Sequence, residues 1–95
     1  MDVLRTLEKQ SGLLRLIVHL AEDGERLLTT VLEDTDISVH QLYASIEKGK
    51  EMGLISSRID RDAYPNRNIL SCTAAGKKVA KKLKEIEGII TSEQA

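Results

Sequence analysis

The chain has 95 residues, of which 41% are hydrophobic, and a formal net charge of −1. This length suits one small domain, and because Phe and Trp are absent the core must be aliphatic. The single cysteine, Cys72, cannot form an internal disulfide, and no apolar run approaches the roughly 20 residues that span a bilayer. The N-terminus also lacks the small-residue cleavage site of a signal peptide, so we expect a soluble, cytoplasmic protein.

Charge is divided unevenly along the chain. Residues 1–47 carry 4 basic and 9 acidic side chains, a net charge of −5, whereas residues 48–95 carry 10 basic and 6 acidic ones, a net charge of +4. Because binding to nucleic acid depends on the local field rather than on the total charge, the second half is compatible with a DNA partner. Ordinary solvated surface charge is the alternative interpretation.

Two helices are predicted in the first quarter of the chain. A short amphipathic helix is indicated by three apolar residues, Val3, Leu4 and Leu7. Ser11 is expected to cap a second, buried helix, which Gly24 ends. His19 lies on this helix without a second histidine at i+4 or a nearby cysteine, so we expect it to be structural. The sequence therefore predicts no metal and no cofactor.

Two capping boxes in succession predict a pair of helices. Thr30-Val-Leu-Glu33, with Thr29 as an alternative cap, opens a helix of one or two turns. Ser38-Val-His-Gln41 opens a second helix, which lasts to about Met52. With Ile46 at the centre of its buried face, a rotation of about 100° per residue groups four residues on that face, Val39, Leu42, Gly49 and Gly53. The opposite face is polar and carries His40, Gln41, Ala44, Lys48 and Glu51, with Tyr43 on the border.

A β-hairpin and a long helix are predicted to follow. Gly53 ends the preceding helix, and strands at 55–60 and 68–72 flank a turn cluster at 62–66. Thr73 then caps the last helix. Four apolar residues on that helix have the spacing of a short coiled-coil seam, Val79, Leu83, Ile86 and Ile90. The seam predicts a homodimer, unless the helix folds back onto its own domain.

The order of these elements resembles the MarR-like group of winged-helix transcriptional regulators. That group typically has a recognition helix ending in Gly-Leu-Val or Gly-Leu-Ile, a wing with an Asp-Arg type tip, and a Leu-Thr-x-x-Gly entry to the next helix. The matching stretches here are Met-Gly-Leu-Ile at 52–55, Asp-Arg-Asp at 60–62 with Asn-Arg at 66–67, and Cys-Thr-Ala-Ala-Gly at 72–76. The resemblance covers about half the chain, and Gly49 departs from it because such helices usually place a leucine there.

The chain is shorter than full MarR regulators, and it is more similar to compact single-domain winged-helix proteins common in archaea, which pair through one C-terminal helix. The resemblance implies a mainly α protein with a small β-hairpin (α+β), a winged helix-turn-helix with a long C-terminal helix. Residues 1–76 would form the DNA-binding domain and residues 77–95 the dimerisation helix. The implied function is that of a sequence-specific regulator of transcription that binds double-stranded DNA and is not an enzyme.

The resemblance assigns the helix from Ser38 to Met52 to the major groove. Its expected DNA-binding residues are Ser38, His40, Gln41, Tyr43, Ala44 and Lys48. Among these, His40 and Gln41 are the best candidates to read bases, although a plain helix surface is the alternative. The expected wing contacts are Arg58, Arg61 and Arg67, and the expected contacts to the DNA backbone at the start of the last helix are Lys77 and Lys78. The seam residues are the expected dimer contacts.

Three alternatives remain open from the residues alone. The wing arginines can pair with Asp60 and Asp62 instead of contacting DNA. Winged helices also act as adaptors between proteins, and the near-neutral charge favours that function. A binder of single-stranded nucleic acid is a third class, which the scarcity of aromatic residues for base stacking opposes.

Overall fold

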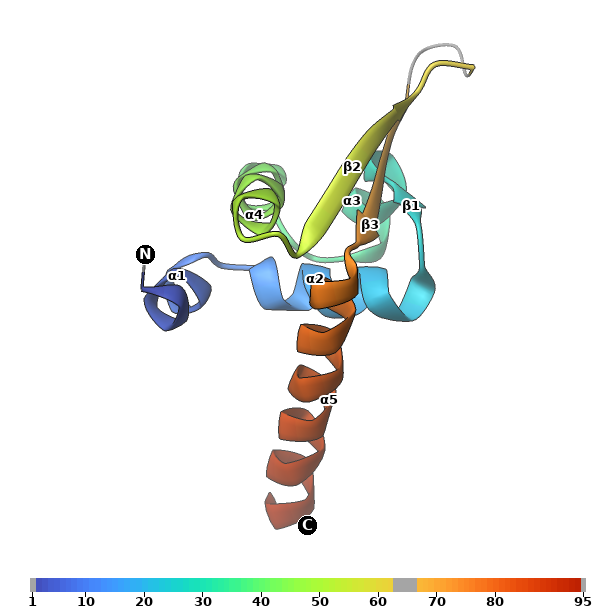
Figure 1. The fold of residues 1–95 in the computed structure, drawn as a ribbon. Coiled ribbons are helices and arrows are strands. Elements are labelled where there is room, and N and C mark those ends of the chain that lie inside the picture. Colours follow the sequence, from blue (N-terminus) through green and yellow to red (C-terminus); the bar gives the residue numbers. More distant parts are fainter. Residues whose placement is uncertain (1, 63–66, 95) are drawn as a thin grey trace.

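The computed structural model describes residues 2–62 and 67–94, and within these ranges it has five helices and a three-stranded antiparallel sheet (Figure 1). The elements in chain order are α1 (Val3–Lys9), α2 (Leu13–Asp23), β1 (Arg26–Leu27), α3 (Leu28–Asp34), α4 (Val39–Glu51), β2 (Ile55–Asp60), β3 (Arg67–Cys72) and α5 (Ala74–Gln94). The protein is therefore mainly helical with a small sheet, which confirms the predicted α+β class. No helix in the described ranges is long and apolar enough to cross a membrane.

The sheet has the strand order β1-β3-β2. The predicted hairpin is present, with Ile55 opposite Cys72 at its base and Asp60 opposite Arg67 at its far end. The strand β1 was not predicted; it pairs with β3 on the side away from β2. Two residues are too few to show the alternation of a strand, so only pairing with β3 defines β1.

The core is aliphatic and is centred on α2, which contacts α4, α5 and β3. Figure 1 shows α2 lying between α4 and the sheet on one side and α5 on the other. Four residues of α2 are almost completely buried, Leu13, Leu16, Ile17 and Leu20. They pack with residues of other elements, including Val31 of α3, Leu42 of α4 and Leu70 of β3. The helix predicted to be central and buried therefore has that place.

Two of the four predicted helix caps are wrong. The residue that caps α2 is Gly12, with a φ of 91°, and Ser11 does not cap it. Helix α3 begins at Leu28, directly after β1, so Thr29 and Thr30 already lie inside its first turn. No side chain caps α3, because the start of that helix is set by the pairing of β1 rather than by a capping box.

The other two predicted caps are confirmed. The Ser38 hydroxyl accepts a hydrogen bond of 3.3 Å from the backbone N–H of Gln41 at the start of α4. The Thr73 hydroxyl accepts one of 3.0 Å from the N–H of Gly76 at the start of α5, and it donates one of 2.6 Å to the carbonyl of Gly53. Gly53 has the left-handed φ of 74° that ends α4 and turns the chain into β2.

The buried face of α4 differs from the predicted one. Val39 and Gly53 were expected on that face, but 56% of the Val39 surface is exposed and Gly53 is exposed as well. Ser45, which was assigned to neither face, is completely buried. Gly49 is buried as predicted, and a methyl group there would collide with the side chain of Ile55 in β2, 2.8 Å from its Cγ1. The missing side chain at position 49 therefore lets β2 pack directly on α4.

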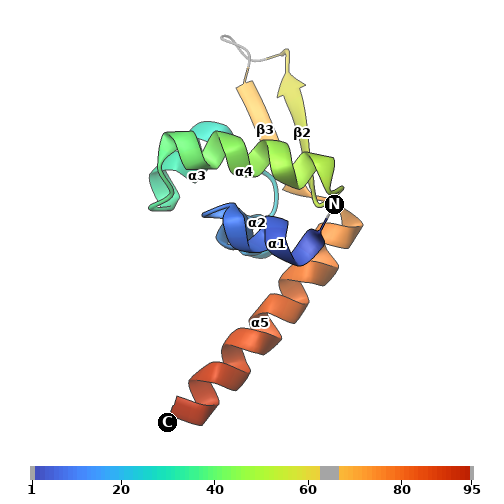
Figure 2. The same ribbon diagram turned by 90° about the vertical axis from the view of Figure 1, so that its left-hand side faces the viewer.

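The long helix α5 has two different halves. Ala80 is buried, and Val79 and Leu83 are half-buried against the core. Farther along, three isoleucines have at least half of their surface exposed, Ile86, Ile89 and Ile90. Figures 1 and 2 show this second half of α5 extending away from the rest of the protein as a free rod.

Candidate nucleic-acid interface

The outward side of α4 begins with an exposed and largely uncharged surface. His40 is exposed, Tyr43 has 51% of its surface exposed, and Gln41 and Ala44 are half-buried. Within the described residues, the side chain of Gln41 makes no hydrogen bond back to Ser38, so it is available for another contact. His40 and Gln41 offer donor and acceptor groups of the kind that read base edges.

The cations of α4 are paired with acids of the same helix. The Lys48 Nζ lies 3.3 Å from a carboxylate oxygen of Glu51, and the Lys50 Nζ lies 3.8 Å from one of Glu47. These ion pairs are partly exposed, so each contributes little to stability. They nevertheless reduce the positive potential along α4. Lys48 is therefore a weaker candidate for a phosphate contact than its sequence position indicates.

The three arginines predicted for the wing are in two different situations. Arg58 is held by Glu25, from the turn between α2 and β1, with an N–O distance of 3.0 Å. This hydrogen bond and the charge of Glu25 raise the pKa of the Arg58 guanidinium above its usual value, and Asp60 adds a smaller attraction. The sequence had placed the competing acid at Asp60 or Asp62. Arg58 instead pairs with a residue 33 positions earlier.

Arg61 and Arg67 are exposed, and within the described residues neither has an acidic side chain within ion-pair distance. Asp60 instead accepts a hydrogen bond of 3.1 Å from the backbone N–H of Asp62. The other predicted turn residues, 63–66, lie outside the described residues. The positive charge of the hairpin that has no acidic partner among the described residues therefore comes from Arg61 and Arg67.

The helix α4 and the β2–β3 hairpin are neighbours in space, and α4 contacts β2. Figure 2 shows α4 running across the body, with the hairpin rising beside it and the free half of α5 pointing the opposite way. The two sets of candidate residues therefore belong to one end of the protein. Lys77 and Lys78 are exposed near the start of α5, where the helix dipole disfavours cations. Figure 1 shows that this end of α5 lies at the base of the hairpin.

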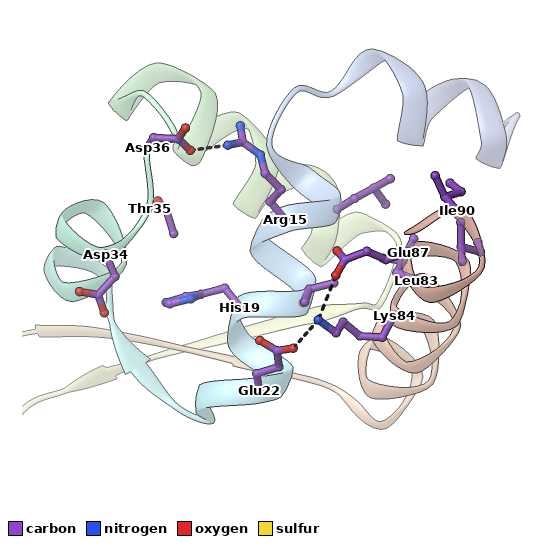
Figure 3. Close-up of a pocket in the computed structure, with 13 residues that line it drawn as sticks. Arg15, His19, Glu22, Asp34, Thr35, Asp36, Leu83, Lys84, Glu87 and Ile90 are labelled. Atoms are coloured by element: carbon purple, nitrogen blue, oxygen red, sulfur yellow. Dashed lines mark hydrogen bonds and ion pairs between the residues drawn. The ribbon is translucent and has the colours of Figure 1, made fainter. Parts of the chain in front are cut away.

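A groove of about 770 Å³ lies between α2 and the second half of α5 (Figure 3). Its apolar lining is Leu14, Val18, Leu83, Ile86 and Ile90. Arg15 is paired with Asp36 at one side. On the α5 side, Lys84 Nζ lies 3.2 Å from Glu22 of α2 and 3.3 Å from Glu87. Three of the four predicted seam residues, all except Val79, therefore lie in one wall of a groove whose other wall is formed by α2 and residues 34–36.

The described residues contain no group of three or more His, Cys, Asp or Glu side chains that could hold a metal ion. The Nδ1 of His19 lies 3.0 Å from a carboxylate oxygen of Asp23, one helical turn later. Burial raises the pKa of the Cys72 thiol, and this thiol donates a hydrogen bond to the carbonyl of Ile17 at 3.3 Å. A protonated, half-buried thiol is a poor nucleophile.

Comparison of the chain with protein-family models, with curated proteins and with solved structures finds no match. Sequence reasoning missed two residues that shape the candidate interface, Glu25 and Ser45. No local signal identifies either of them, because each acts on a residue more than 30 positions away.

Proposed function

We propose that the protein is a sequence-specific regulator of transcription that binds double-stranded DNA through a winged helix-turn-helix and acts in the cytoplasm. Helices α3 and α4 are the helix-turn-helix, and the β2–β3 hairpin is the wing. The observation that carries the proposal is the combination of a side-chain-capped helix with an exposed polar N-terminal face and, beside it, a hairpin with two exposed arginines that have no acidic partner among the described residues. Major-groove and backbone contacts need these two kinds of surface.

The candidate residues divide between two tasks. On α4, His40 and Gln41 read bases, while Ser38, Tyr43 and Ala44 line the same N-terminal surface. Arg61 and Arg67 bind phosphates or enter the minor groove, because the guanidinium group suits both. Secondary contacts to the DNA backbone come from the cations that are paired or lie farther away, Arg58, Lys48, Lys77 and Lys78.

The test is a mobility-shift titration of the intact protein on duplex DNA at several salt concentrations. We expect binding that weakens with salt, with a log-log slope of about −0.9 for each phosphate neutralised. A pool of random duplexes should contain sequences that bind more tightly than the average. Absence of any shift at low salt would reject the proposal and favour an adaptor.

An adaptor between proteins is the second candidate function, and one observation favours it. Val39 and Tyr43 expose more than half of their surfaces on α4, and the lysines of that helix are paired. Aromatic and aliphatic residues on an exposed helix face are typical of protein contacts. Val39→Ala distinguishes the two functions: Val39 is not among the proposed DNA contacts, so DNA binding should change little, whereas a protein interface that includes Val39 should lose affinity.

We propose that the protein is a homodimer through α5. The isoleucines of its second half, Ile86, Ile89 and Ile90, keep at least half of their surface uncovered by the described residues. Two copies of α4 can then contact successive major grooves about 34 Å apart on a palindromic site.

The dimer is tested by sedimentation of the variant with Ile86→Glu and Ile90→Glu. Both side chains are exposed, so the variant should fold and sediment as a monomer with much weaker binding to duplex DNA. Ile59→Glu is the matched control in the sedimentation experiment, because Ile59 is similarly exposed but lies in β2. This variant should keep the mass of the dimer. An unmodified protein that is monomeric at micromolar concentration would refute the dimer.

A further inference from the structure

The most unusual residue of α4 is Ser45, a polar residue that is completely buried. Its hydroxyl donates a hydrogen bond of 3.1 Å to the carbonyl of Ser11, in the connection between α1 and α2. A buried serine needs such a partner because its hydroxyl has lost water. The bond therefore joins the middle of α4 to a segment 34 residues earlier in the chain.

Gln10, in the same connection, reaches α4 at two points. Its Nε2 lies 3.4 Å from the Ser45 hydroxyl and 3.5 Å from the backbone carbonyl of Gln41. These contacts are long, so each is weak alone, but both are partly buried. Gln41 and Ser45 are one helical turn apart and lie on the same side of α4. The side chain of Gln10 therefore lies against the backbone of a residue proposed to read bases.

The third member of the connection, Gly12, contacts the segment just before α4. Its φ is 91°, and a methyl group there would lie 2.9 Å from Cγ2 of the buried Ile37. The α1–α2 connection, residues 10–12, thus lies against α4 at its middle, through Ser45, and against the chain that enters it, through Ile37. Contacts at two separated points restrict both the position and the tilt of a helix.

We infer that the α1–α2 connection sets the position of α4 for base reading, with Ser45 and Gln10 as positioning residues that need not touch DNA. The inference rests on the proposed DNA-binding function. Base contacts require placement of side chains within about 0.5 Å, whereas flexible arginines follow phosphates over longer distances. Loss of the Ser45 hydrogen bond should therefore reduce sequence preference far more than general affinity for DNA.

The experiment compares Ser45→Ala with the unmodified full-length chain. Binding is measured by fluorescence anisotropy on the best duplex selected from a random pool and on a random duplex, at a temperature at which both proteins are folded. We expect the Kd for the selected duplex to rise about tenfold, equivalent to about 1.4 kcal/mol, which is the lower range of one base contact. The Kd for the random duplex should remain nearly unchanged. Gln10→Ala should have a smaller effect in the same direction.

Ser11→Ala is the matched control, because it removes a serine hydroxyl from an exposed side chain but keeps the carbonyl that Ser45 needs. It should leave both Kd values unchanged. Equal losses on the two duplexes for Ser45→Ala, or a lower melting temperature without a change in preference, would overturn the inference and leave Ser45 as a packing residue.

A second measurement does not depend on DNA. In the free protein, Ser45→Ala and Gln10→Ala should both move the amide NMR signals of residues 39–42, whereas Ser11→Ala should not. Unmoved signals for both variants would overturn the inference. If the unmodified protein binds no duplex, the proposed function fails; moved signals would then still support the control of α4 position by the connection.

Discussion

The helix α4 and the β2–β3 hairpin are neighbours, but they carry charge in different ways. The lysines of α4 are paired with acids three residues away, which leaves a nearly neutral helix whose distinctive groups are His40 and Gln41. The hairpin instead exposes Arg61 and Arg67 without an acidic partner in the described residues. The comparison indicates that, if DNA is the partner, sequence preference comes from α4 and salt-dependent affinity from the hairpin.

The two regions also depend on each other mechanically. The side chain of Ile55 in β2 occupies the space that a side chain at Gly49 of α4 would need. The Thr73 hydroxyl, just after β3, donates a hydrogen bond to the carbonyl of Gly53, just after α4. A methyl group on Gly76, at the start of α5, would likewise collide with the backbone carbonyl of Leu54. A substitution in this shared region should therefore disturb both the α4 surface and the hairpin surface. A substitution on one of the two surfaces should change the property of that surface alone.

The largest effect should come from Gly49→Leu, which fills the space held by Ile55. We expect the free energy of unfolding to fall by about 3 kcal/mol, because the overpacked core must move β2 away from α4. Chemical denaturation measures this loss. Gly88→Leu is the control, since a side chain at position 88 meets open space, and it should gain up to about 1 kcal/mol from helix propensity. Similar results for both variants would show that Gly49 has no packing role.

The next effect should come from Gln41→Ala, which removes a proposed base contact while keeping the backbone N–H that Ser38 caps. Binding to the preferred duplex should weaken by about 1 to 3 kcal/mol, and binding to random DNA should change little. Glu47→Ala, on the same helix, should leave the ratio of the two affinities unchanged. A parallel loss on both duplexes for Gln41→Ala would assign general affinity to α4 and break the proposed division.

The hairpin should control the dependence on salt. Changing both Arg61 and Arg67 to Ala should flatten the log-log slope by about 1.8, at about 0.9 for each phosphate contact. The preference for one sequence over another should be largely retained. Arg5→Ala with Lys9→Ala is the control, because it removes two exposed cations from α1. An unchanged slope in the hairpin variant would exclude Arg61 and Arg67 from the interface.

The smallest effect should follow Glu25→Gln, which releases Arg58 from its ion pair. A freed Arg58 should steepen the salt dependence by at most about 0.9 and tighten binding to all duplexes alike. Stability should change little because the pair is exposed. Glu22→Gln removes an acid that pairs with Lys84 on α5 instead, and it should leave binding unchanged. Weaker binding after Glu25→Gln would mean that the pair positions Arg58 for contact.

Local sequence patterns predicted much of the region from α4 to the start of α5. Ser38 and Thr73 cap their helices, Gly53 turns the chain after α4, and the hairpin strands begin and end within one residue of the predicted bounds. Each of these features depends on groups only a few residues apart, such as a hydroxyl and an N–H three positions later. Local sequence patterns were therefore sufficient to predict the order of the elements in this region.

The candidate interface was less predictable. The prediction for the α4 surface was right at His40, but Val39 is exposed where burial was expected, and Ser45, which was assigned to neither face, is completely buried. The helical period predicts a direction for each side chain and does not reveal which other segment lies there. Because the α1–α2 connection packs beside Ser45 with a carbonyl available, a serine is suitable at that buried position.

The sequence by itself determined the mainly helical α+β class, the aliphatic core around α2, and the limits of α4 and the hairpin, because composition and short-range hydrogen bonds decide these features. Only the tertiary structure decided that β1 exists, that Arg58 pairs with Glu25, and that the apolar seam of α5 shares a groove with α2. Each of these depends on contacts between residues more than 30 positions apart, whose partners no local pattern specifies.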